Sequence, residues 1–139
     1  MADKTTGSYD FIIIGSGVTG LAAAMYAARL GLKTLCLGTN SSSELPIGGV
    51  ITTTDMVENY PGFLRITGAG LAEVIKKHAE SYDLVEIKEE KANEIIKDQD
   101  LFIVKTSANT YKGKTILFAT GTKWKKLEVP GSKEFENKG

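Results

Sequence analysis

The sequence has little of what a metal site, a disulfide framework or a charged binding surface requires. Among its 139 residues there is one cysteine, Cys36, and one histidine, His78. No internal disulfide can form, and no cluster of thiolate and imidazole ligands is available for a metal. The 17 basic residues balance 17 acidic residues, so no overall field favours nucleic acid. We expect Cys36 to be a small buried residue, His78 to be solvated, and the protein to be cytoplasmic, without nucleic-acid or metal partners.

Long hydrophobic runs are also scarce. The stretch from Phe11 to Ala28 is uncharged and approaches the length of a membrane span. However, it contains three glycines, and the β-branched cluster at residues 12–14 favours a buried strand. We therefore divide it into a strand at residues 11–14 and a helix at residues 18–30. The N-terminal residues MADKTTGSYD do not have the pattern of a signal peptide, so no membrane segment is expected.

The remaining pattern predicts a single α/β domain. Gly31 is placed to end the first helix, and residues 33–37 form a second apolar strand, which together give a right-handed βαβ unit with parallel strands. A long polar stretch follows at residues 38–63 and is expected to lack regular structure. The later elements are a helix at 70–82, a strand at 84–90, an antiparallel β-meander at 92–98, 101–107 and 110–121 with a last apolar strand at 115–119, and an exit loop at 122–139.

The first strand leads directly into a glycine motif. Gly15-Ser16-Gly17-Val18-Thr19-Gly20 has the spacing G-x-G-x-x-G between a strand and a helix, as a dinucleotide-binding motif requires. Gly15 permits a tight turn, Gly17 allows the backbone to approach a pyrophosphate, and Gly20 allows close packing of helix and strand. The phosphates would bind the unpaired N–H groups at the start of the helix.

One expected element of such a site is missing. The second strand of a dinucleotide-binding unit commonly ends in an acidic residue that binds the adenosine ribose. Here it ends at Leu37-Gly38, and no Asp or Glu occurs between Phe11 and Ser43. Either the ribose is bound by backbone, by Thr39 or Asn40, or by Glu44, or the dinucleotide interpretation is wrong.

Four segments together resemble a known family. FIIIGSGVTGLAAAMYAARLGLKTLCLG, IGGVITTTDMVENYPGF, ILFATGT and VPGSKEF resemble the FAD-binding part of low-molecular-weight thioredoxin reductases, which are pyridine nucleotide-disulfide oxidoreductases. The resemblance covers essentially the whole chain. It implies a Rossmann-like FAD-binding domain over residues 1–139, with a central parallel sheet, flanking helices and an antiparallel meander.

The resemblance also implies which residues contact FAD. Gly48-Gly49 and the threonines 52–54 would form a wall beside the ribityl chain and flavin, and Asn59 would offer its amide to the polar edge of the isoalloxazine. Val50 stands where the family usually has glutamine, and Gly38 replaces the ribose acid, as in some other members. The full set of implied cofactor contacts is Gly15, Ser16, Gly17, Val18, Thr19, Gly20, Gly38, Thr39, Gly48, Gly49, Val50, Thr54, Asn59, Ala92, Ala119, Thr120 and Gly121.

The segments that such reductases need for turnover are not in this sequence. It has no Cys-x-x-Cys pair, no second glycine fingerprint for an NADPH-binding domain and no closing FAD segment. We expect a portion of a longer homodimeric enzyme that passes electrons from NADPH through FAD to a disulfide and on to thioredoxin or a similar small redox protein. This chain alone would hold no catalytic residue and would be inactive. The alternatives are a related ferredoxin or flavodoxin reductase, a stand-alone FAD-binding module without catalysis, and a nicotinamide-binding Rossmann domain.

Overall fold

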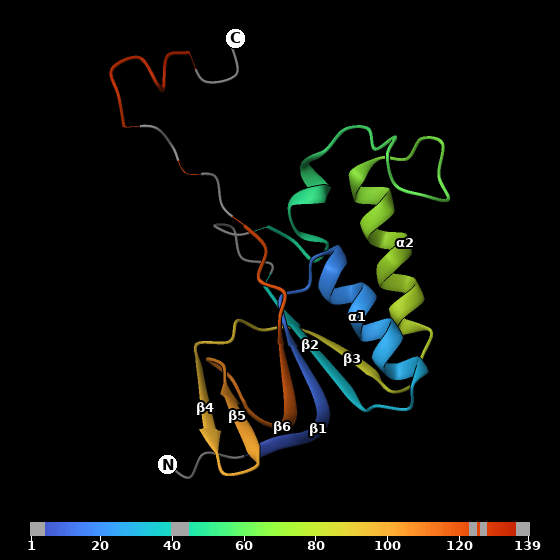
Figure 1. Ribbon diagram of the computed structural model, residues 1–139, viewed down its shortest axis with the longest axis vertical. Coiled ribbons are helices and arrows are strands. Elements are labelled where there is room, and N and C mark those ends of the chain that lie inside the picture. Colours follow the sequence, from blue (N-terminus) through green and yellow to red (C-terminus); the bar gives the residue numbers. More distant parts are fainter. Residues whose placement is uncertain (1–4, 40–44, 123–124, 126–127, 136–139) are drawn as a thin grey trace.

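The computed structural model describes residues 5–39, 45–122, 125 and 128–135, and these fold into one six-stranded sheet with helices on one face. The strand order is β3-β2-β1-β6-β5-β4 (Figure 1). In it β3, β2, β1 and β6 are mutually parallel, β5 is antiparallel to β6, and β4 is antiparallel to β5. The predicted α/β fold with a central parallel sheet and a β-meander is confirmed. In chain order the elements are β1 (Thr5–Ile14), α1 (Val18–Arg29), β2 (Thr34–Gly38), the 3₁₀ helix η1 (Gly49–Thr53), α2 (Gly68–Glu80), β3 (Val85–Glu89), β4 (Glu94–Asp98), β5 (Leu101–Lys105) and β6 (Thr110–Phe118).

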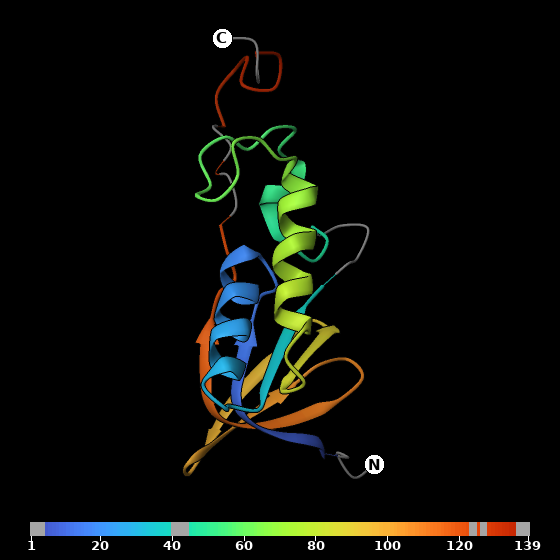
Figure 2. The same cartoon turned by 90° about the vertical axis from the view of Figure 1, so that its right-hand side faces the viewer.

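The second half of β1 and the centre of β2 are apolar on both faces because both faces are covered there. Successive side chains of a strand point to opposite sides, so Ile12 and Ile13, both fully buried, enter different cores. Ile13 packs with Cys36 and with alanines of α1 and α2, whereas Ile12 packs with Val104 and Tyr111 of the meander. Figures 1 and 2 show α1 and α2 side by side over one face and the β4–β5 hairpin over the other.

Two strands differ in extent from the prediction. β1 begins at Thr5 rather than at Phe11, because its polar first half pairs in parallel with the first half of β6. Tyr9 in this half is buried against Tyr111, with ring centroids 6.1 Å apart. β6 is one continuous strand that pairs with β5 over residues 110–113 and with β1 along most of its length. The meander therefore extends the parallel sheet rather than forming a separate one.

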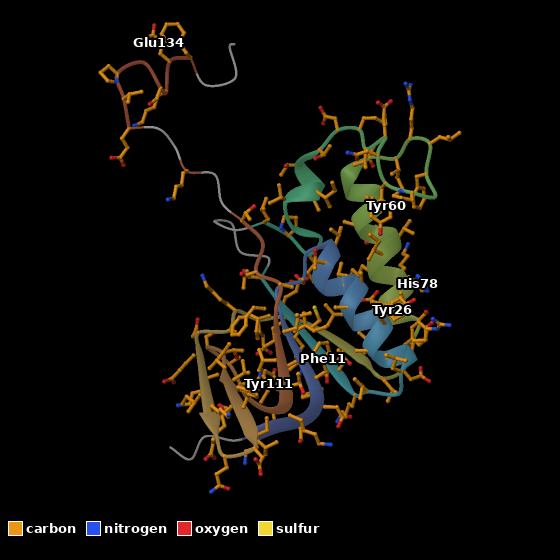
Figure 3. All side chains as sticks on the ribbon, viewed as in Figure 1. Phe11, Tyr26, Tyr60, His78, Tyr111 and Glu134 are labelled. Carbon is orange, nitrogen blue, oxygen red and sulfur yellow. The ribbon has the colours of Figure 1, made fainter. Side chains whose placement is uncertain are left out.

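The helices begin and end close to the predicted positions. α1 ends at Arg29, and Gly31 adopts φ +82°, so the predicted terminating role of this glycine is confirmed. α2 begins at Gly68, earlier than predicted, because the Thr67 hydroxyl caps it by accepting a 3.1 Å hydrogen bond from Gly70 N–H. His78 lies exposed on the outer side of α2, as predicted (Figure 3). Neither helix of the described chain is long and apolar enough to cross a membrane.

The single cysteine is a core residue. Cys36 is completely buried in β2, and this burial raises the pKa of its thiol to about 12. A protonated, inaccessible thiol is a poor nucleophile and a poor metal ligand. In the described part of the chain no three residues of the metal-binding types are grouped.

A carboxylate joins the end of β3 to the meander. Glu90 accepts hydrogen bonds from the Thr106 hydroxyl at 2.7 Å, the Asn109 side-chain amide at 2.8 Å, and the Tyr111 hydroxyl at 2.9 and 3.0 Å. Partial burial alone would raise the pKa of Glu90, but the hydrogen bonds from Thr106, Tyr111 and Asn109 outweigh it and hold the pKa below its usual value. The charged form is thus favoured by folding.

We expect Glu90→Gln to destabilise the protein by roughly 1–2 kcal/mol at pH 7, because an amide cannot accept all of these hydrogen bonds. Since the pKa is lower in the folded state, the contribution of Glu90 is present above the unfolded pKa and is lost as the pH falls through the folded pKa. Urea unfolding should therefore show a difference between wild type and variant that shrinks below about pH 4. Glu89→Gln, at an exposed neighbouring position, is the control, and an equal loss in both variants would contradict the assignment.

Candidate functional site

The turn between β1 and α1 is packed too tightly for side chains at two of its glycines. Gly15 has φ +114°, and a Cβ atom there would lie 2.2 Å from the carbonyl oxygen of Ala119. A Cβ atom at Gly20 would lie 1.9 Å from the carbonyl oxygen of Gly15. Real Cβ atoms do not come this close to backbone oxygen. The predicted structural roles of Gly15 in the turn and of Gly20 in close packing are therefore confirmed.

Gly17 is different, because the described residues leave room for a side chain beside it. Its φ of −69° is open to any residue, and a Cβ atom would meet only the carbonyl oxygen of Gly48, at 3.7 Å. Gly17 caps α1 without any side-chain hydrogen bond to the helix, and no acidic residue occupies the first turn. The corner thus has the side-chain-free approach that a diphosphate would need.

The first amides of α1 are available as donors. The first intrahelical hydrogen bond runs from Leu21 N–H to Gly17 O at 2.9 Å. The Gly17–Gly48 bridge directs Val18 N–H at the Gly48 carbonyl oxygen, whereas the N–H groups of residues 19 and 20 have no acceptor among the described residues. Aligned, unpaired N–H groups together with the helix macrodipole attract anions. The geometry of this corner is suited to binding phosphate through backbone rather than through basic side chains.

A second glycine pair lies against this corner. Gly48 N–H donates to Ser16 O at 2.8 Å, and Gly17 and Gly48 form an isolated parallel bridge. Gly48 and Gly49 both have positive φ, at +110° and +71°. A Cβ atom at Gly48 would lie 2.5 Å from Cβ of Ala72 in α2. The structure therefore brings together, backbone to backbone, the two glycine segments that the sequence placed on opposite sides of β2.

The residues after β6 complete the same edge of the sheet. Ala119 N–H donates to Ile14 O at 2.8 Å, so the two parallel strands leave the sheet together (Figure 1). Thr120 is exposed, and Gly121 has φ +71° with open space beside it. Open α/β sheets bind their ligands beyond the carboxyl ends of their strands. Gly15–Gly20, Gly48–Gly49 and Ala119–Gly121 all lie there.

The threonines after the second glycine pair are not equivalent. Thr52 and Thr53 donate their hydroxyls at 2.8 Å to the carbonyl oxygens of Gly49 and Val50, within η1. Thr54 is exposed, and no described residue binds its hydroxyl. Val50 is 42% exposed. Of the three threonines, Thr54 thus has a side chain free to contact a ligand.

Two predicted contacts come from other segments of the chain, and two of the proposed ribose-binding residues lie beyond the described residues. Asn59 is exposed in the loop between η1 and α2, which is closed by the Val57–Ile66 bridge. Ala92, after β3, packs against the core cluster on the meander side of the sheet, a structural role that the sequence did not indicate. Two of the proposed ribose-binding residues, Asn40 and Glu44, fall outside the described part of the chain.

Gly38 has a steric partner that sequence reasoning missed. A Cβ atom at Gly38 would lie 1.7 Å from Oγ and 2.4 Å from Cβ of Ser16. Ser16 is only 5% exposed, so its side chain is fixed over the end of β2. No local pattern could have shown this contact, because the two residues are separated by the whole of α1.

Comparisons with known proteins agree with this geometry. Residues 9–139 match the family model described as pyridine nucleotide-disulphide oxidoreductase. The chain is 37% identical over 131 residues to thioredoxin reductase of Bacillus subtilis, covering 94% of this chain and 40% of that protein. It is 32% identical over 139 residues to NADH dehydrogenase of the same organism, covering 99% of this chain and 26% of that protein.

A solved structure shows the same fold. The Lactococcus lactis thioredoxin reductase superposes with a TM-score of 0.79 at 37% identity, over 91% of this chain and 40% of that chain. The present chain thus spans about two fifths of the length of the thioredoxin reductases it matches.

Proposed function

Because the chain belongs to the pyridine nucleotide-disulphide oxidoreductase family, we propose that residues 1–139 form the FAD-binding part of a thioredoxin reductase-type flavoprotein. The observation that carries the proposal is the corner at Gly17, where a Cβ atom would meet only the Gly48 carbonyl oxygen among the described residues, beside helix N–H groups of residues 19 and 20 that have no acceptor there. A dinucleotide diphosphate fits this donor set, since it brings negative charge and acceptor oxygens to amides that have no other partner among the described residues.

The chain's own contribution is to bind and orient the cofactor. The amides at the start of α1 would hold the diphosphate, while Gly48–Gly49 and Ala119–Gly121 would let the cofactor pass close to the backbone. The Thr54 hydroxyl and the Asn59 amide would meet the polar edge of the flavin. Gly38, Thr39, Val50 and Ala92 complete the proposed set of contacts. When bound, FAD supplies the redox chemistry.

The proposal for the whole protein follows from its relatives. A thioredoxin reductase moves electrons from NADPH through FAD to a disulfide, and the partner we propose is thioredoxin or a similar small redox protein. The NADPH and disulfide sites would lie in parts of the enzyme that this chain does not include. We further propose that the complete protein is a cytoplasmic homodimer, in keeping with the reduced, buried state of Cys36.

The test is direct binding of FAD to the purified chain. We expect added FAD to give a protein-bound flavin spectrum in the visible range and to raise the melting temperature, whereas NADPH should stabilise the chain much less. Any nucleotide that copurifies should be released by denaturation and identified as FAD. A chain that gives neither a bound flavin spectrum nor thermal stabilisation with excess FAD would overturn the proposal, as would preferential stabilisation by NADPH.

A further inference from the structure

The side chain of Ser16, from the turn between β1 and α1, lies at the end of β2, where dinucleotide-binding folds commonly carry an acid. Gly38 is the last residue of β2 and pairs with Glu89 at the carboxyl edge of the sheet. In a βαβ dinucleotide-binding unit, a carboxylate at this point binds the hydroxyls of the adenosine ribose. Here the volume in which such a side chain would begin is occupied by Ser16 Oγ, 1.7 Å from the ideal Cβ position of Gly38.

The Ser16 side chain is buried, and its hydroxyl has no partner among the described residues. The residue is only 5% exposed, and no described residue hydrogen-bonds its side chain. In the described part of the chain no fully enclosed side-chain oxygen lacks a partner, so the unpartnered Ser16 oxygen is not fully enclosed. A hydroxyl on a largely buried side chain that no described residue bonds, beside the predicted nucleotide corner, is available to bond a ligand. A serine hydroxyl offers one donor and two acceptor sites, which is the complement of a ribose hydroxyl.

The backbone of Ser16 holds this side chain in place. Its carbonyl oxygen accepts the 2.8 Å hydrogen bond from Gly48 N–H, and it lies between Gly15, whose conformation is restricted by Ala119, and Gly17, the cap of α1. The same residue thus links the diphosphate corner to the end of β2. The adenosine ribose of a dinucleotide lies between these two points.

Resting on the proposed function, we infer that the Ser16 hydroxyl binds the adenosine ribose in place of the missing acid, and that residue 38 is glycine because Ser16 occupies the space of its side chain. Ser16 is therefore a residue that recognises the ribose, and the residue type at position 38 depends on the side chain at position 16. A neutral hydroxyl replaces the usual negative charge at this point of the site.

The first experiment pairs a protein change with a ligand change. Binding of ADP, 2′-deoxy-ADP and 3′-deoxy-ADP to the chain is measured by calorimetry for wild type and Ser16→Ala. We expect Ser16→Ala to weaken ADP binding roughly five- to tenfold. One of the two deoxy analogues lacks the hydroxyl that Ser16 contacts. Wild type and Ser16→Ala should bind that analogue with equal affinity. The exposed Ser8→Ala is the matched control and should bind all three ligands as wild type does.

The outcomes separate this inference from the proposed function. If wild type binds FAD and ADP but Ser16→Ala binds ADP equally well, or loses affinity equally for all three ligands, the ribose assignment is overturned and the FAD proposal stands. If neither FAD nor ADP binds wild type, the proposed function fails, and the assignment of Ser16 fails with it.

A second experiment tests the pairing of the two positions. Gly38→Glu alone places a Cβ atom against Oγ and Cβ of Ser16 and should lower both the melting temperature and ADP affinity. Adding Ser16→Gly removes the two atoms nearest to that Cβ atom, and the next nearest is the backbone nitrogen of residue 16, at 3.3 Å. The double variant should recover stability and should prefer ADP over the same deoxy analogue more strongly than Ser16→Gly alone does. A double variant no better than Gly38→Glu would contradict the pairing.

Discussion

Gly17→Val is expected to abolish FAD binding without unfolding the protein. The backbone at residue 17, with φ −69° and ψ 176°, is accessible to valine, and the added Cβ would meet only the Gly48 carbonyl oxygen at 3.7 Å. The side chain would instead occupy the space beside the first N–H groups of α1. Displacing a diphosphate from them removes two or more charge-assisted hydrogen bonds of about 1.5–3 kcal/mol each, which corresponds to a loss of affinity of at least about 100-fold.

The measurement combines an FAD titration with thermal unfolding of the variant without ligand. The control is Ala69→Val, which adds valine's two γ-methyl groups at an exposed position in the first turn of α2. We expect similar melting temperatures for both variants, within a few degrees of wild type, and loss of FAD binding only in Gly17→Val. If Gly17→Val binds FAD with wild-type affinity, the diphosphate does not lie at this corner.

Gly15→Ala is expected to have the largest effect on stability. The substitution forces an L residue into φ +114° and places its Cβ atom 2.2 Å from the Ala119 carbonyl oxygen. Backbone strain of about 1–3 kcal/mol and a steric conflict of similar size give a destabilisation of roughly 2–6 kcal/mol. Relief of the conflict requires β1 and the end of β6 to separate, which would also disrupt the corner.

Gly31→Ala isolates the steric part of this effect. Gly31 also has positive φ, +82°, but nothing lies within 4 Å of a Cβ atom there. It should cost only about 1 kcal/mol, the strain of one residue in the left-handed region. Chemical unfolding of Gly15→Ala and Gly31→Ala measures the free energy of unfolding that each variant loses. Equal losses would mean that contact with Ala119 does not restrict residue 15.

The local patterns of the sequence were sufficient to predict the corner. The apolar strand, the three glycines and the alanine-rich helix are consecutive, and each glycine's role follows from its position between a strand and a helix. Cys36 could be placed in the core because it lies between Leu35 and Leu37 in an apolar run. The predicted end of α1 was correct because Gly31 can adopt positive φ at no steric cost.

The features that were missed depend on distant segments. The polar half of β1 has no apolar pattern, and Tyr9 is buried only because the meander folds over it. The sequence treated three consecutive threonines alike, whereas the 3₁₀ turn commits the hydroxyls of Thr52 and Thr53 to its own carbonyls and leaves Thr54 free. The Ser16–Gly38 contact could not be predicted, because the sequence does not show that the Ser16 side chain points over the end of β2.

The continuity of β6 makes the two sides of the sheet energetically interdependent. Its residues 110–113 lie between β5 and β1, and its later residues pair with β1, so opening the hairpin removes one neighbour of the strand that leads to Ala119. Local opening in proteins follows such shared elements, and a strand common to both regions joins them into one cooperative unit. Ligand held at the glycine corner would therefore also slow hydrogen exchange in β4 and β5, although it touches neither strand.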